Sequence, residues 1–255
     1  MANEIELPIY DICKHNILYC GENSKKIAIN LQTNYGTSNL IYEGQDGFNI
    51  SRPDILLIDD EFIYGIEHFE FDDFKRRKGS TGKAYINKKE KDFQKNFNEY
   101  GVKLPCYSEF YGVDNEENLQ IGYDFFVDNF IYAFDEHYNK INEYKININK
   151  FLEENNLSKK IKIYFLIENA SLIMPFVSGI DKYNGCIYTP FYSKEIQDKI
   201  KESNLLDGII SLNKNNTPLT FIYSKDDCDI NELSPIIDKQ YYHSASKPHI
   251  HQTQF

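Results

Sequence analysis

The chain contains no tryptophan and very little arginine, although 20 tyrosines and 18 phenylalanines make 15% of its 255 residues aromatic. With 41% hydrophobic residues, this composition excludes an intrinsically disordered protein and is typical of a globular one. The net charge of −11 excludes a protein whose whole surface attracts polyanions. Any contact with a polyanion therefore has to come from a local basic patch.

Cysteine is sparse as well, and the five cysteines contain no CxxC pair and match no common metal-ligand spacing. Their odd number and wide spacing favour a reduced, intracellular protein, and we expect a cytoplasmic location. The first residues carry acidic side chains where a secretory signal needs basic ones. Because no uninterrupted apolar run approaches the length of a membrane-spanning helix, we expect no membrane partner.

Hydrophobic periodicity predicts an α/β or α+β fold, in which helices flank a mixed central sheet. The predicted elements are helices at 24–34, 87–100, 123–152 and 194–203, and strands at 55–58, 62–71, 161–167, 207–212 and 219–223. Ser24 is a candidate N-cap, and residues 35–51 predict a loop because they are rich in Gly, Asn and Ser. We expect one globular domain over residues 1–255, with a helical insertion at 79–158 and a polar tail at 242–255.

The helix predicted from residue 123 carries a long apolar stripe at heptad-like spacing. Its members are Val127, Ile131, Phe134, Tyr138, Ile141, Ile148 and Leu152. The stripe favours packing against the sheet over the alternative, a coiled-coil seam between two copies of the chain.

The most informative segment is 51–72, where acidic residues accompany two predicted strands. Asp54 follows a proline at the start of the first strand, and the second strand carries Glu67, His68 and Glu70. Acidic side chains at the ends of neighbouring strands can converge on one hard cation, Mg²⁺ or Mn²⁺. Such a centre suits metal-assisted hydrolysis of phosphodiesters.

Strand alternation divides these acids into two sets. Glu67 shares a face with Ile63, Phe69 and Phe71, whereas His68 and Glu70 share the other face with Phe62, Tyr64 and Ile66. Either Glu67 joins Asp54, or His68 and Glu70 do. A bulge near Gly65 would change this register.

With Pro53-Asp54 ahead of one strand and Glu67 in the next, the sequence resembles the PD-(D/E)xK nuclease superfamily. The family core has a helix, a strand pair that carries the acids, a further helix and more strands. Residues 24–34, 55–71 and 161–167 fill those places. The resemblance implies a nuclease in which Asp54 and Glu67 are the metal ligands and Mg²⁺ or Mn²⁺ is the cofactor.

The chain departs from the family pattern at Phe69, which stands where the family has a lysine. His68 or Glu70 can replace that lysine in the shifted register. A lysine can also reach in from the segment that follows, where the candidates are Lys75, Lys78 and Lys83. The third alternative is an inactive site on a fold that is retained for binding.

All of the arginine lies in or beside the strand pair. Arg52 precedes the first strand, and Lys75, Arg76, Arg77 and Lys78 follow the second. Arginine offers a planar fork that suits phosphate, so these five residues are candidates for contact with a nucleic-acid backbone. The alternative is a solvated loop, which is the usual role of a charged run.

Two functions therefore compete. The first is a divalent-metal-dependent nuclease that acts on DNA or RNA, in genome defence or mobile-element biology. Its candidate catalytic residues are Asp54, Glu67, His68, Glu70 and Lys83. The second is a catalytically inactive, nuclease-like protein that binds or inhibits a protein partner, which the missing lysine and the many tyrosines favour.

Overall fold

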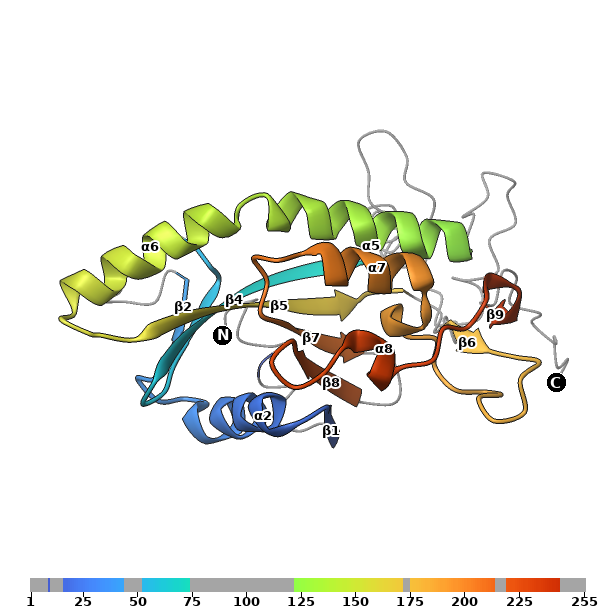
Figure 1. The fold of residues 1–255 in the computed structure, drawn as a ribbon, viewed down its shortest axis with the longest axis horizontal. Coiled ribbons are helices and arrows are strands. Elements are labelled where there is room, and N and C mark those ends of the chain that lie inside the picture. Colours follow the sequence, from blue (N-terminus) through green and yellow to red (C-terminus); the bar gives the residue numbers. More distant parts are fainter. Residues whose placement is uncertain are drawn as a thin grey trace, which may run out of the picture.

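A mixed seven-stranded sheet runs through the protein (Figure 1), and the computed structural model describes residues 9, 16–43, 52–73, 122–171, 175–213 and 219–243. Across the sheet the strands are β1 (Asn16–Tyr19), β8 (Leu219–Ser224), β7 (Gly208–Asn213), β5 (Lys160–Asn169), β4 (Phe62–Phe71), β3 (Ile55–Ile58) and β2 (Leu40–Tyr42). Strand β5 is parallel to both β4 and β7, and β1 is parallel to β8. The remaining neighbours are antiparallel, which makes the sheet mixed as predicted.

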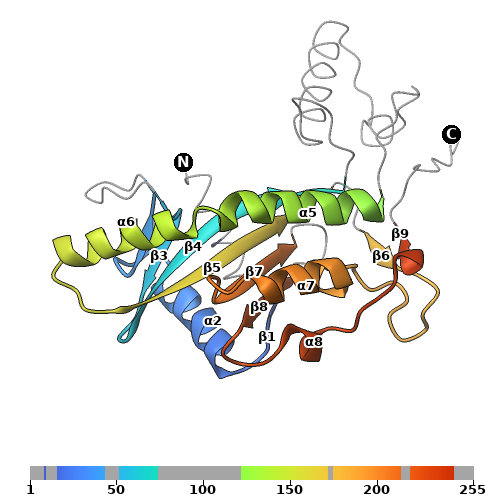
Figure 2. The same cartoon turned by 45° about the horizontal axis from the view of Figure 1, so that its top comes forward.

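Helices cover both faces of this sheet (Figures 1 and 2). Helices α5 (Tyr123–Tyr138), α6 (Ile141–Glu154) and α7 (Lys194–Glu202) lie on one face, and α2 (Glu22–Asn34) lies on the other. Each face has its own cluster of buried apolar side chains. Because both faces are buried, β3 and β5 read as nearly continuous apolar runs in the sequence.

Short elements complete the described chain. They are β6 (Phe176–Val177), η1 (Pro190–Tyr192), α8 (Ile230–Leu233), η2 (Lys239–Tyr241) and β9 (Tyr242–His243), which pairs with β6. The helix predicted at 87–100 lies outside the described residues. No helix in the described part of the chain combines the length and apolar character needed to cross a membrane.

The predicted long helix is divided in two. Helix α5 ends in a tight turn, in which the Lys140 amide donates to the His137 carbonyl 3.0 Å away, and α6 begins at Ile141. Figure 1 shows α6 inclined to α5, which keeps both apolar stripes against a sheet that twists beneath them. Val127, Phe134 and Ile148 lie in the core on this face, so the stripe packs against the sheet as expected.

Two local predictions at the N-terminal side are wrong. Residues 40–42 form strand β2, because they pair with β3 as the outer strand of the sheet. Helix α2 starts at Glu22, two residues before the predicted cap. Asp227, from beyond the end of β8, accepts hydrogen bonds of 2.8 Å from the backbone amides of Asn23 and Ser24. A distant carboxylate thereby satisfies amides that a local cap would otherwise serve.

Residues 242 and 243, predicted as part of a polar tail, belong to the fold. Tyr242 is buried, and its ring lies between those of Phe126 and Tyr188. Its hydroxyl donates to Asp73 Oδ2 at 2.8 Å. The polar tail therefore starts no earlier than residue 244, and residues 244–255 lie outside the described residues. Residues 79–121 of the predicted insertion also lie outside them.

Gly65 lies in an uninterrupted ladder between β3 and β4, opposite Leu56, so no bulge shifts the register there. Its missing side chain leaves room for α6, because a Cβ at this position would lie 2.6 Å from Ile148 Cδ1 and 3.0 Å from Pro53 Cγ. The glycine thus allows the close approach of helix and sheet.

We predict that Gly65→Ala lowers the free energy of unfolding by about 1–3 kcal/mol, because the added methyl group overpacks the core. Urea unfolding measures the change. The matched control is Gly122→Ser, since a Cβ at Gly122 meets nothing within 4 Å. Equal stability of Gly65→Ala and the wild-type chain would contradict this packing.

A second prediction concerns Asp73. Burial raises the pKa of its carboxyl from 3.8 to about 6, although the hydrogen bond from Tyr242 acts in the opposite direction. A carboxyl whose pKa is higher in the folded state than in the unfolded state stabilises the folded protein at pH values below the unfolded-state pKa. This contribution disappears as the pH rises through about 6. The free energy of unfolding should therefore fall between pH ~4 and pH ~7 in the wild type.

Asp73→Asn removes the ionisable group and should flatten this pH dependence, while the exposed Asp60→Asn should keep it. Urea unfolding of the three proteins along a pH series measures the difference. Identical slopes for wild type and Asp73→Asn would refute the assignment.

Candidate metal centre

Strands β3, β4 and β5 bring polar side chains to one region of the sheet, near the carboxyl ends of β4 and β5. Strand β5 runs parallel to β4, so the carboxyl ends of these two strands coincide, whereas β3 runs antiparallel and begins at Ile55, opposite Ile66 in the middle of β4. The register places Glu70 directly beside Glu168. Carboxyl ends of parallel strands are a common place for ligand sites in open α/β sheets.

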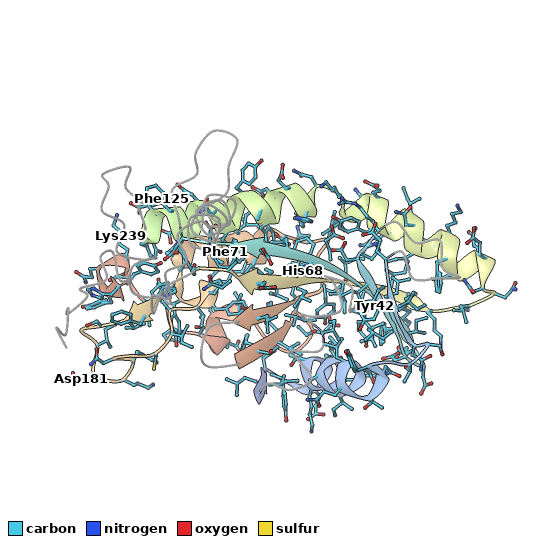
Figure 3. All side chains as sticks on the ribbon, turned by 180° about the vertical axis from the view of Figure 1, so that it is seen from behind. Tyr42, His68, Phe71, Phe125, Asp181 and Lys239 are labelled. Atoms are coloured by element: carbon cyan, nitrogen blue, oxygen red, sulfur yellow. The ribbon has the colours of Figure 1, made fainter. Side chains whose placement is uncertain are left out.

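His68, Glu70 and Glu168, here called the His68 group, can converge on one ion. Their ligand atoms all lie within 4.8 Å of one another, and His68 Nε2 is 3.2 Å from Glu168 Oε2. His68 (Figure 3) and Glu70 are half-buried on β4, and Glu168 is 2% exposed at the end of β5. One imidazole and two carboxylates form a mixed nitrogen and oxygen donor set.

Asp54 lies next to this group. Its Oδ2 accepts a hydrogen bond of 2.7 Å from the backbone amide of His68. Burial, followed by repulsion from the Glu67 carboxylate, raises the pKa of Asp54 to about 6, and the hydrogen bond from His68 opposes that shift. Asp54 is therefore poised to change its charge near neutral pH.

Glu67 points to the opposite face of β4, as alternation predicts. It is 1% exposed, and its Oε1 lies 2.9 Å from Tyr144 Oη, 2.9 Å from His137 Nδ1 and 3.3 Å from Arg52 Nη1. The other carboxylate oxygen, Oε2, is buried without a hydrogen-bond partner in the described part of the chain. Arg52, a candidate for phosphate contact, is thus engaged with a buried carboxylate.

Phe69, at the position of the family's lysine, belongs to the core. Its ring stacks on His137 with centroids 4.8 Å apart and meets Phe165 edge-on at 5.4 Å. A lysine here would have to place its ammonium among aromatic rings, so the apolar residue fits this position better.

The structure brings His68 and Glu70 together with Glu168, which the sequence reasoning missed, and joins Asp54 to them through the backbone amide of His68. The signal was present, since an acid follows directly after the apolar run 161–167. The other candidates lie outside the described residues: Lys75, Arg76, Arg77, Lys78 and Lys83. Their roles stay predictions, as does the ligand pair of Asp54 with Glu67 that the resemblance implies.

Comparison with known proteins adds no relative: no protein-family model, no curated protein and no solved structure matches this chain.

We predict that Tyr144→Phe lowers the free energy of unfolding by about 1–3 kcal/mol, because the buried Glu67 carboxylate loses a hydrogen-bond donor. The control is Tyr132→Phe, since Tyr132 is 51% exposed on α5. Thermal and urea unfolding compare the two variants. A Tyr144→Phe protein as stable as the control would show that this hydrogen bond does not stabilise the buried charge.

Proposed function

We propose that the protein is a divalent-metal-dependent nuclease that hydrolyses phosphodiester bonds in DNA or RNA, in defence or mobile-element biology. The observation that carries the proposal is that the three side chains of the His68 group converge near the carboxyl ends of β4 and β5. Asp54 accepts a hydrogen bond from the backbone amide of His68 in this group. The order of helix α2, strand pair β3–β4, helices α5–α6 and strand β5 supports the resemblance to the PD-(D/E)xK nucleases. Free thiols at Cys20, Cys186 and Cys228 support a cytoplasmic location.

The donor set bears on the choice of metal. Carboxylates suit Mg²⁺ and Mn²⁺ alike, whereas an imidazole nitrogen favours a transition metal. We therefore infer that Mn²⁺ serves this centre better than Mg²⁺. A divalent ion bound there would hold a phosphate oxygen and lower the pKa of an attacking water.

The residues around the His68 group divide the remaining work. With a pKa near 6, Asp54 can accept a proton from the attacking water at neutral pH. The basic segment 75–78, together with Lys83, would hold the phosphate backbone and balance its charge. In this assignment Glu67 stabilises the inner face of β4 and is not a ligand.

We predict that metal-free protein supplied with Mn²⁺ cleaves nucleic acid and that Glu168→Gln lowers the rate by about a hundredfold or more, because a neutral amide replaces a metal ligand. Calorimetry should show at least a tenfold weaker Mn²⁺ affinity for the same variant. Single-stranded and duplex DNA and RNA are the substrates to compare.

Glu154→Gln is the matched control, because this glutamate is 58% exposed near the end of α6. Glu67→Gln separates the two ligand sets: the His68 group predicts little change in Mn²⁺ affinity, and the pair of Asp54 with Glu67 predicts its loss. Unchanged cleavage and Mn²⁺ affinity in Glu168→Gln would refute the His68 group as the centre.

A second candidate function also has a specific observation in its favour. Glu67 is engaged with Arg52 and Tyr144, and Phe69 fills the lysine position with core packing. Both features suit an inactive, nuclease-like protein whose acidic surface binds a basic protein partner in place of phosphate. A folded protein that gives no calorimetric signal with Mn²⁺ or Mg²⁺ would favour this function over catalysis.

A further inference from the structure

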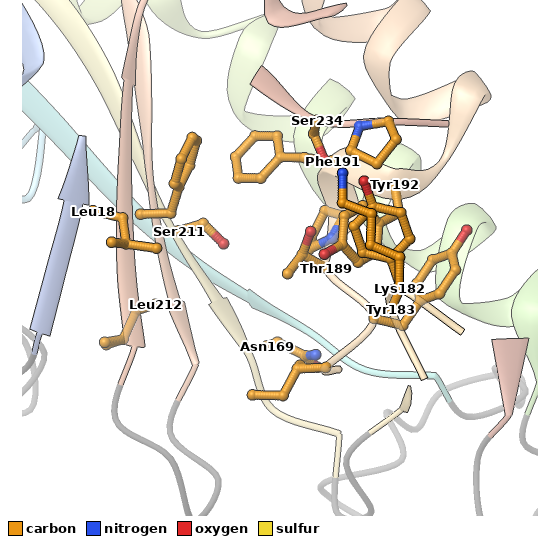
Figure 4. Close-up of a pocket in the computed structure, with 15 residues that line it drawn as sticks. Leu18, Asn169, Lys182, Tyr183, Thr189, Phe191, Tyr192, Ser211, Leu212 and Ser234 are labelled. Atoms are coloured by element: carbon orange, nitrogen blue, oxygen red, sulfur yellow. The ribbon is translucent and has the colours of Figure 1, made fainter. Parts of the chain in front are cut away.

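A cavity of about 320 Å³ lies on the other face of the sheet from the His68 group, at the ends of β5 and β7. Figure 4 shows Leu18 and Ser211 on one side of it and Tyr183 and Tyr192 on the other, with Asn169 below them in this view. The volume is at the small end of the range for ligand sites, about 300–1,000 Å³, and suits a single ring system with its sugar.

Aromatic rings dominate the walls of this cavity. Phe221 of β8 lies against Phe191 with ring centroids 5.0 Å apart, and across the cavity Tyr183 and Tyr192 lie 6.1 Å apart. Aromatic rings on several sides of a cavity suit a flat ring, because an aromatic ligand gains from stacked or edge-on contacts with them. An aliphatic chain would use such walls less well.

Polar groups at the floor and mouth of the cavity favour a ligand that can also accept hydrogen bonds and carry negative charge. Asn169 is 4% exposed, and its Oδ1 accepts a hydrogen bond of 3.0 Å from the Ser171 amide. This leaves its amide N–H groups to donate to a ligand, with the Ser211 hydroxyl as a further partner. At the exposed mouth, Lys182 provides a cation near the Tyr183 ring, 5.1 Å from its centroid. The cavity therefore offers stacking, hydrogen-bond donors and a phosphate-attracting charge.

The cavity and the His68 group are linked through β5. Glu168 and Asn169 are consecutive residues of this strand, and alternation turns them to opposite faces. Consecutive Cα atoms are about 3.8 Å apart, so the two sites lie across a single strand end. One nucleic-acid strand that passes around this end could place a phosphate at one site and a base at the other.

We propose that the cavity binds a nucleobase that is unstacked from a nucleic-acid strand and held between aromatic rings. The inference rests on the proposed nuclease function, since it names the form of the substrate: a single strand, or a duplex from which one base is displaced. Base stacking on aromatic side chains binds single strands without reading their sequence.

The test uses metal-free, full-length protein and a short single-stranded DNA that carries one 2-aminopurine. The chain contains no tryptophan, so the fluorescence of this base analogue is easily separated from that of the protein. We expect the fluorescence to fall on binding as the base stacks. Tyr183→Leu and Phe221→Leu should each weaken binding by about tenfold or more, because each removes a stacking ring.

Tyr132→Leu, which removes an exposed aromatic ring outside the cavity, should bind as the wild type does. Tyr183 and Phe221 are both only half-buried, so both variants should fold. Equal affinity for a strand of the same length in which every nucleotide is abasic would overturn the proposal. So would equal affinity for a free nucleoside monophosphate, since the cavity would then be a site for free nucleotides.

Failure of this proposal is distinguishable from failure of the proposed function. Glu168→Gln should lose cleavage and still show the fluorescence change with the 2-aminopurine strand, because Glu168 does not line the cavity. Cleavage that depends on Glu168, with no fluorescence change in any strand, would retain the nuclease and reject the cavity. A fluorescence change lost in Tyr183→Leu, with no cleavage under any metal, would retain the cavity and reject the nuclease.

Discussion

The parallel pairing of β4 with β5 is the constraint on which the rest of the structure depends. It is continuous from Phe62 opposite Lys160 to Phe71 opposite Asn169. This register sets Glu70 beside Glu168 and leaves Asn169 on the far side of the strand. A slip of one residue would move every side chain of β4 to the other face and dismantle both sites.

The two faces of β4 place very different demands on their charged residues. Glu67 is buried among aromatic rings, and Arg52 and Tyr144 lie against only one of its oxygens. Core packing alone explains a buried glutamate poorly, because a buried ion pair can often be replaced by apolar residues without loss of stability. On the opposite face, His68, Glu70 and Glu168 stand close together, with their ligand atoms all within 4.8 Å of one another.

Regular local patterns were sufficient for much of the fold. The period of two in 62–71 predicted that Glu67 would part from His68 and Glu70, and this is confirmed because the β4 ladder has no bulge. Strand β2 escaped prediction because three residues in a polar segment become a strand only through their pairing with β3. The break between α5 and α6 escaped prediction because the apolar spacing continues across it.

The site could be predicted only in part, for a related reason. Which acids share a face follows from one strand, but which strands are neighbours depends on pairings between distant residues. Glu168 is 100 residues from His68 in the sequence. Nothing in the pattern around 161–167 shows that this strand lies parallel to β4. Likewise, the sequence marks Phe69 only as an ordinary strand residue. The contacts of its ring with His137 and Phe165 come from the folded structure.

Asp54 couples the two faces electrostatically. The Glu67 carboxylate on one face adds to the effect of burial in raising its pKa, while the His68 amide on the other side holds its Oδ2. A cation in the His68 group would act in the opposite direction to Glu67, since a nearby positive charge favours the ionised carboxylate. Metal binding and ionisation of Asp54 would then reinforce each other by linkage, each raising the population of the state that the other prefers.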